Sequence, residues 1–142
     1  MRMRIERLDQ PTDQDRLAIL NPLLAYSESK VNNPYFQNFA LVVRDEHSDE
    51  ILGGLYAKIS YQWLYVELLS VPEQARGQGV GTRLMHMVEE LAREKDCTGI
   101  WLGTFDFQAP QFYKKLGFTQ YGQIDDYPPG HRQHFFQKRL KP

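Results

Sequence analysis

The chain has 142 residues, of which 42% are hydrophobic and 25% charged, and its formal net charge is −1; this predicts one folded domain over residues 1–142 rather than a disordered segment. Because no basic cluster stands out and no apolar run approaches the ~20 residues of a membrane span, we expect neither nucleic acid nor a membrane as the main partner. The single cysteine, Cys97, cannot form an internal disulfide, and the first residues lack the apolar core of a signal peptide, so we expect a cytoplasmic protein.

The first half of the chain predicts one strand, one helix and then three strands. Residues 3–8 alternate weakly and indicate the strand, and Thr12 or Asp13 can cap a helix that passes Leu17 to Leu24, although Pro22 interrupts its pattern. The next strands are expected over residues 39–43, 51–59 and 61–71, which are rich in branched and aromatic side chains.

The second half predicts two helices and three strands. Residues 80–95 form the clearest helix, because their apolar side chains repeat on one face. A buried strand follows over residues 98–103, then a short helix over 108–116 with Pro110 in its first turn, and closing strands over 118–124 and 133–140. This order implies an α/β fold, a mixed sheet with helices on both faces.

The segment between the strand at 61–71 and the helix at 80–95 carries the most informative pattern. Gly77, Gly79 and Gly81 occupy every second position there. Glycine tolerates a positive φ and lets the main chain approach a ligand closely. The helix that follows presents unpaired N–H groups and a partial positive charge at its first turn. A strand, a glycine loop and a helix N-terminus together indicate a phosphate-binding site.

Two familiar phosphate loops do not match this spacing. A P-loop needs a Lys-Ser or Lys-Thr pair after its last glycine, whereas Gly81 is followed by Thr82 and Arg83. A dinucleotide loop needs G-x-G-x-x-G near the first strand, whereas these glycines are spaced differently and lie in mid-chain.

The loop instead resembles the acetyl-CoA signature of the GNAT N-acetyltransferase superfamily, Arg/Gln-x-x-Gly-x-Gly/Ala, at Arg76, Gly79 and Gly81. Further along, Ala109, Tyr113 and Gly117-Phe118 resemble the late helix of that family, and residues 126–131 resemble a segment of its small bacterial members. The resemblance implies a mostly antiparallel central sheet, acetyl-CoA as co-substrate and a possible homodimer.

The resemblance also implies how the co-substrate is held. The pyrophosphate would bind the backbone amides of the loop, which comprises Arg76, Gly77, Gln78, Gly79, Val80, Gly81 and Thr82. The strand end at Leu69, Ser70 and Val71 would splay from its neighbour and pair with the pantetheine arm, and the N–H of Leu69 would polarise the thioester carbonyl. Leu69 and Val71 can also be core side chains, because the functional groups there are backbone.

Tyr113 is the candidate general acid. A phenol has a pKa of about 10 and can protonate a departing thiolate, and the family often has a tyrosine at this helix position. The alternative is that Phe112 and Tyr113 are only core aromatics. The family usually has an asparagine where this chain has Asp106, which can instead help to cap the helix.

Glu67 is the candidate general base, acting directly or through water. Strand alternation would place it on one side with Trp63, Tyr65, Leu69 and Val71, and a carboxylate among apolar neighbours can relay an amine proton. The alternatives are a surface acid or an ion-pair partner. A dedicated base is not required, because a fraction of an amine is always unprotonated.

The acceptor side is the least determined. Either His131 or His134 can face an acceptor pocket, and we expect no metal because the histidine spacing lacks supporting carboxylates or cysteines. Aromatic side chains, with Asp125 and Asp126 nearby, suit a cationic small-molecule amine; they are Tyr26, Tyr35, Phe36, Trp63 and Tyr127. Other possible functions are acetylation of a protein or peptide amine, a non-catalytic acyl-CoA sensor and a partner-binding domain.

Overall fold

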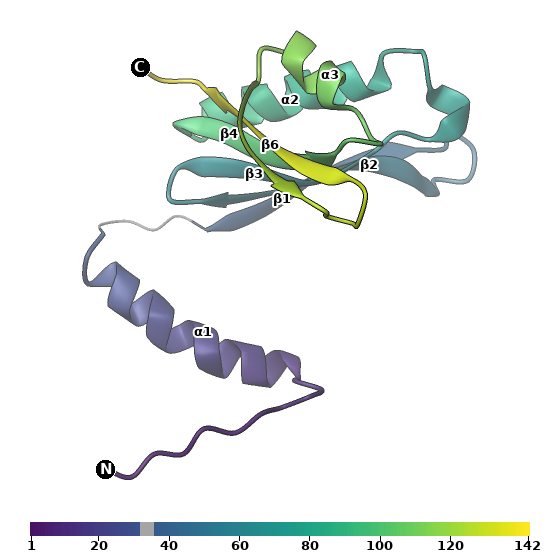
Figure 1. Ribbon diagram of the computed structural model, residues 1–142. Helices are drawn as coiled ribbons and strands as arrows, with labels where there is room; N and C mark the ends of the chain where they lie inside the picture. Colours follow the sequence, from purple (N-terminus) through teal and green to yellow (C-terminus); the bar gives the residue numbers. More distant parts are fainter. Residues whose placement is uncertain (32–35) are drawn as a thin grey trace. The chain divides into compact units, whose positions relative to one another are not determined.

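The computed structural model describes residues 1–31 and 36–142, which fall into two units, Met1–Pro34 and Tyr35–Pro142. The first unit holds one helix, α1 (Asp13–Glu28), which continues through Pro22 (Figure 1). A capping box starts it: the N–H of Asp15 donates to Oγ1 of Thr12 at 3.1 Å, and the Asp15 carboxylate accepts from the N–H of Thr12 at 2.9 Å.

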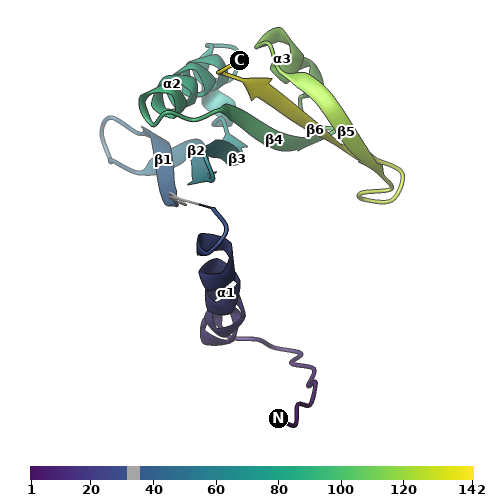
Figure 2. The same ribbon diagram turned by 90° about the vertical axis from the view of Figure 1, so that its left-hand side faces the viewer.

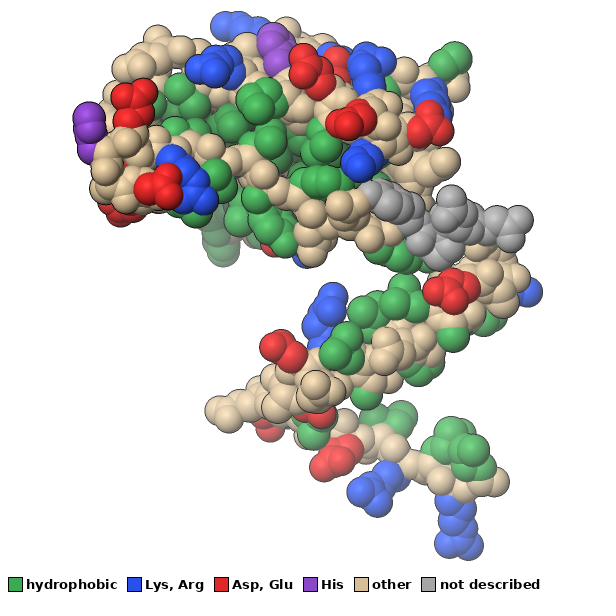
Figure 3. Space-filling model, turned by 180° about the vertical axis from the view of Figure 1, so that it is seen from behind, with side chains coloured by type: hydrophobic (Ala, Val, Ile, Leu, Met, Phe, Trp, Pro, Cys, Tyr) green, Lys and Arg blue, Asp and Glu red, His purple; other side chains and the backbone are tan. Residues whose placement is uncertain are grey.

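The strand expected at residues 3–8 is wrong, because residues 1–12 form neither helix nor strand. A strand satisfies its backbone groups only through a paired strand, and the side chains of Met3 and Ile5 are exposed. No residue of α1 is buried, and its surface carries many hydrophobic side chains (Figure 3).

The second unit is built on a six-stranded sheet of order β1-β2-β3-β4-β6-β5 (Figures 1 and 2). Only β3 and β4 pair in parallel, so the sheet is mixed and mostly antiparallel, as the sequence predicts. The strands are β1 (Gln37–Arg44), β2 (Ile51–Ser60), β3 (Trp63–Ser70), β4 (Gly99–Phe105), β5 (Thr119–Asp125) and β6 (Arg132–Arg139).

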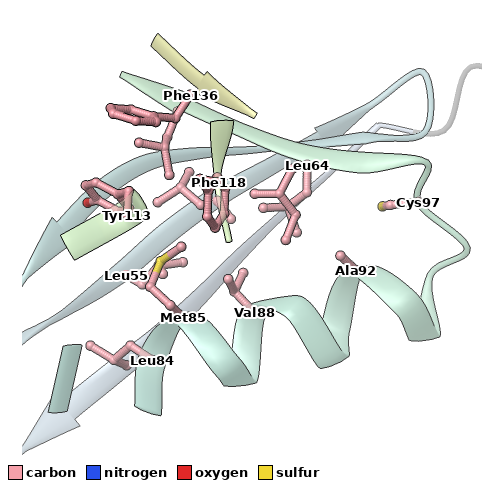
Figure 4. Close-up of a cluster of buried hydrophobic side chains, with 14 of the residues drawn as sticks. Leu55, Leu64, Leu84, Met85, Val88, Ala92, Cys97, Tyr113, Phe118 and Phe136 are labelled. Carbon is pink, nitrogen blue, oxygen red and sulfur yellow. The ribbon is translucent and has the colours of Figure 1, made fainter. Parts of the chain in front are cut away.

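Two helices lie over the same face of this sheet, α2 (Val80–Glu94) and α3 (Pro110–Lys115) (Figure 2). A short 3-10 turn (Glu73–Ala75) precedes α2. The apolar stripe of α2 packs against β2, β3 and β4, and Tyr113 of α3 and Phe118 join the same core (Figure 4). Cys97 is buried there, as expected for a small apolar side chain.

The core therefore fixes α2 and α3 against the centre of the sheet, above the parallel pair of β3 and β4. No helix in the described residues is long and apolar enough to cross a bilayer.

Candidate active site between β3 and β4

The site begins where β3 and β4 separate. Their parallel pairing runs from Trp63 with Gly99 to Val66 with Leu102 and ends there, although both strands continue. Beyond that point, the edge of β3 that faces β4 has no strand partner among the described residues. Its backbone groups at residues 67–70 are therefore free to pair with an extended ligand, which is the splayed geometry expected at Leu69 and Ser70.

A β-bulge at Glu67 accompanies this separation. On β2, Tyr56 pairs with Leu68 but the next residue, Ala57, pairs with Val66, so Glu67 is the extra residue of β3. A bulge bends its strand and changes which face the following side chains occupy. The bend coincides with the end of the pairing with β4.

The bulge makes part of one expectation wrong: Glu67 shares the face of Tyr65 but not that of Leu69 and Val71. Simple alternation groups Glu67 with Leu69 and Val71, but Leu69 pairs with buried Leu55 and packs on the core, and Val71 lies beside Gly81 of α2. Glu67 instead contacts Lys58, which pairs with Tyr65, on the opposite face of the sheet. Its side chain thus lies across the sheet from α2.

The glycine loop has the backbone geometry of a ligand cradle. Gly77 and Gly79 have φ of +79° and +75°, and a Cβ added at either would meet nothing within 4 Å. Gly79 is the N-cap of α2, and no side chain caps that helix. The first amides of α2 are therefore free of side-chain competition and available to an anion.

Gly81 plays a different part from the one expected. It lies within α2, and its φ is not positive. A Cβ there would sit 3.4 Å from both Phe112 and Val71, so this glycine permits close packing of α2 against α3 and the end of β3.

A cavity of about 850 Å³ joins these features. It follows the free edge of β3, the glycine loop, the end of β4 and the start of α3. Its lining includes nearly all the residues named as co-substrate ligands from the sequence, namely Leu69, Ser70, Val71, Arg76, Gly77, Gly79, Val80, Gly81, Thr82 and Tyr113, together with Glu67. Gln78 is not among the lining residues, and its side-chain amide donates to the carbonyl of Gln74.

Tyr113 lies at the inner end of this cavity and is almost fully buried. Its ring packs edge-on against Phe112 and Phe118, and at a tilt against Phe136. This burial raises the pKa of the phenol to about 12. Tyr113 therefore keeps its proton throughout the neutral range, as a proton donor must, and it is also a core aromatic.

Glu67 lies on the cavity wall with its carboxylate 3.1 Å from Nζ of Lys58. Its surroundings are thus not purely apolar, and of the two alternatives, a surface acid and an ion-pair partner, the contact with Lys58 matches the ion-pair partner. The pair is partly exposed, so it contributes little to stability.

The family comparison agrees with this geometry. The model of the Acetyltransferase (GNAT) family matches residues 6–118. The chain belongs to this family. Blasticidin-S acetyltransferase from Streptomyces morookaense is 46% identical over 92 residues, which are 64% of this chain and 68% of that protein.

Two crystal structures show the same GNAT fold. An acetyltransferase from Bacillus cereus is 37% identical with a TM-score of 0.83, and the match covers 95% of this chain and 98% of that one. An Agrobacterium tumefaciens protein assigned as an acetyltransferase is 31% identical with a TM-score of 0.91, over 97% and 100% of the two chains. The chain is thus a GNAT acetyltransferase by sequence and by fold.

The corner between β4 and α3 adds residues to this GNAT site that the sequence did not single out. Oε1 of Gln108 accepts from Oγ1 of buried Thr104 at 3.2 Å and from the N–H of Phe105 at 2.9 Å. These bonds hold the turn so that Thr104, Phe107 and Gln108 all line the cavity. The sequence indicates these three residues only by their position, directly before the Ala109 to Phe118 motif.

Asp106 does not cap α3, which corrects that suggestion. The N-cap is Ala109, with no side-chain hydrogen bond. Oδ1 of Asp106 instead lies 3.1 Å from Nδ1 of His131, the last residue of the β5–β6 loop. A bond between residues this far apart in sequence forms only through the fold.

The aromatic residues expected around the acceptor lie in different parts of the structure. Tyr127 packs against Phe105 at the β4–α3 corner. Trp63 lies under Arg139 and Phe36 packs on Tyr61, and neither lines the cavity. Tyr26 belongs to the first unit, and Tyr35 lies outside the described residues.

The remaining polar residues of the acceptor hypothesis have other partners. Asp125 pairs with Arg132 at 3.4 Å, and Asp126 accepts from the N–H of Gly130. His134 pairs with Thr104 across the strands, and its Nδ1 is buried without a partner among the described residues.

Proposed function

We propose that this GNAT protein transfers the acetyl group of acetyl-CoA to a primary amine of a small molecule, by direct attack in a ternary complex. One observation carries the proposal: a single cavity runs from the uncapped N-terminus of α2, along the free edge of β3, to Tyr113 and Glu67.

The residues present fit acetyl-CoA. The space beside Gly77 and Gly79 has room for a pyrophosphate, which would accept from the loop amides and the first turn of α2. The pantetheine arm would extend along the free edge of β3, where the N–H of Leu69 would polarise the thioester carbonyl.

The chemistry then needs two proton movements. The amine nitrogen attacks the carbonyl carbon, so that a C–N bond forms and the C–S bond breaks. Glu67, directly or through water, accepts the proton that the amine loses. Tyr113 donates its phenolic proton to the departing thiolate, and the products are an amide and free CoA.

Two observations favour a small acceptor. The chain is similar to a protein named for acetylation of blasticidin S, and its own formal net charge is only −1. Acetylation of a peptide amine and non-catalytic acyl-CoA binding are the alternatives. The cytoplasmic location, the homodimer and the single domain over residues 1–142 remain predictions.

An acceptor screen tests the proposal. The full chain is incubated with acetyl-CoA and a panel of small amines and lysine-containing peptides, and free CoA thiol and product mass are followed. We expect thiol release that depends on a small amine. Product from peptides alone would indicate a peptide acetyltransferase, whereas acetyl-CoA binding with no product would indicate a sensor. Absence of a thermal shift with acetyl-CoA would leave only a partner-binding role.

A further inference from the structure

A compact group of aromatic rings lies beside the cavity, at the corner between the end of β4 and the β5–β6 loop. The rings of Phe105 and Phe107 stack with centroids 5.2 Å apart and planes within 5°. Tyr127 packs on Phe105 at 5.4 Å, and His131 meets Phe107 edge-on at 5.1 Å. We call Phe105, Phe107, Tyr127 and His131 the corner ring cluster.

This cluster is open to a ligand as well as internally packed. Phe107 lines the cavity and is 57% exposed, and Tyr127 is 46% exposed. Large apolar side chains held in place yet exposed beside a cavity are characteristic of binding surfaces rather than of core.

A carboxylate belongs to the same group. Asp106 lies in sequence between Phe105 and Phe107, and its Oδ1 contacts Nδ1 of His131 at 3.1 Å. About a third of the Asp106 side chain is exposed. The neighbouring loop adds Asp126, whereas the charge of Asp125 is balanced by Arg132 at 3.4 Å. Negative charge is therefore in excess around the rings.

The geometry points to the corner ring cluster and Asp106 as a subsite for a cationic group of the acceptor, separate from the amine that is acetylated. Aromatic faces and a carboxylate together bind ammonium or guanidinium groups. The acetylated nitrogen must be unprotonated when it attacks, so the bound cation is a second group on the same molecule. This assignment rests on the proposed function and identifies its acceptor class as small amines with a second positive charge.

The position of the cluster fits a subsite for the second cationic group rather than for the amine that is acetylated. Phe105 is on β4 beyond its last pair with β3, and Phe107 is in the turn that leads to the helix of Tyr113. A cation held there lies beside the cavity that contains the proposed thioester position, and the loop amides at its other end remain free for the pyrophosphate.

The test compares a matched pair of probes, 1,5-diaminopentane and 1-aminopentane, with the full chain and acetyl-CoA. The wild type is expected to acetylate the diamine with kcat/KM about tenfold higher, because the second ammonium adds a cation–π and charge contact. Asp106→Asn keeps the shape and an acceptor oxygen for His131, so it should remove most of this preference by raising KM for the diamine.

Three controls separate charge from structure. Asp106→Glu should recover part of the preference. Tyr127→Leu removes a ring of the cluster that does not line the cavity, so it should reduce the preference without changing acetyl-CoA affinity. Asp125→Asn changes the net charge by the same amount as Asp106→Asn but should leave the preference nearly intact. Unfolding midpoints and acetyl-CoA affinity are measured for every variant.

The outcomes are distinguishable. Acetylation of both probes with equal kcat/KM, or an equal loss in Asp106→Asn and Asp125→Asn, would overturn the subsite while leaving the proposed function intact. Failure to acetylate any amine of the panel would overturn both.

Discussion

The two walls of the cavity are built in different ways. The wall proposed for the co-substrate comes from one continuous stretch, Leu69 to Thr82, with glycines at the two positive-φ positions, and its proposed ligands are backbone groups. The opposite wall, at the β4–α3 corner, is lined by Phe107 and Gln108. Side chains from separate segments meet beside it, as Asp106 and His131 do. A site made of backbone depends on where side chains are missing, whereas a site made of side chains depends on which segments the fold brings together.

The largest effect is expected from a side chain that fills the space along the glycine loop. Gly79→Val places a branched side chain in the open space of the loop, and we expect acetyl-CoA affinity to fall by about 100-fold or more, equivalent to ~2.7 kcal/mol. Isothermal titration with acetyl-CoA measures it.

Gly130→Val is the matched control. Gly130 also has a positive φ, +84°, and open space at its Cβ, but it lies in the β5–β6 loop and does not line the cavity. Both variants should lose similar stability from backbone strain. An equal loss of acetyl-CoA affinity in both would contradict a phosphate site at Gly79.

This difference also explains what the sequence could predict. The glycine spacing and the Ala109 to Phe118 motif identify the loop, Tyr113 and the mixed sheet, because these features are local or periodic. The bulge at Glu67 was missed, because an extra residue in one strand is defined by its partner strand. The Asp106–His131 contact was missed for the same reason: it depends on how β4, β5 and β6 pair.

The next largest effect is expected at Tyr113, the buried side chain proposed as the general acid. Tyr113→Phe removes only the hydroxyl, so we expect kcat to fall by about 100-fold through loss of the general acid, with acetyl-CoA affinity little changed. Steady-state kinetics and titration separate the two.

Tyr65→Phe, which loses a phenol stacked on Trp101 and outside the cavity lining, should keep normal kcat. An unchanged kcat for Tyr113→Phe would remove Tyr113 as the acid.

A smaller effect is expected at Glu67, where the two walls meet. Glu67→Gln keeps the shape but cannot accept a proton, and we expect kcat/KM to fall by about tenfold, below the usual contribution of a base because water can substitute at this partly exposed site. The pH dependence of kcat/KM should change as well. Lys58→Met breaks the 3.1 Å ion pair but keeps the carboxylate, so it should retain most activity. An identical pH profile for Glu67→Gln and the wild type would reject the base role.

The smallest effect concerns stability at alkaline pH. Burial raises the pKa of Tyr113 to about 12 in the folded chain, against about 10 for an unfolded tyrosine. The unfolded chain therefore loses this proton first, so the stabilising contribution is complete below pH ~10 and is lost as the pH rises from ~10 to ~12. The interval from about pH 9 to about pH 11 covers only part of this titration, so we expect a loss on the order of 1 kcal/mol over it. Urea unfolding at about pH 9 and about pH 11 measures it, and Tyr113→Phe should lose less stability over this interval than the wild type.

If both lost stability equally, the phenol would titrate alike in the folded and unfolded chains, and Tyr113 would face open solvent rather than the inner end of the cavity.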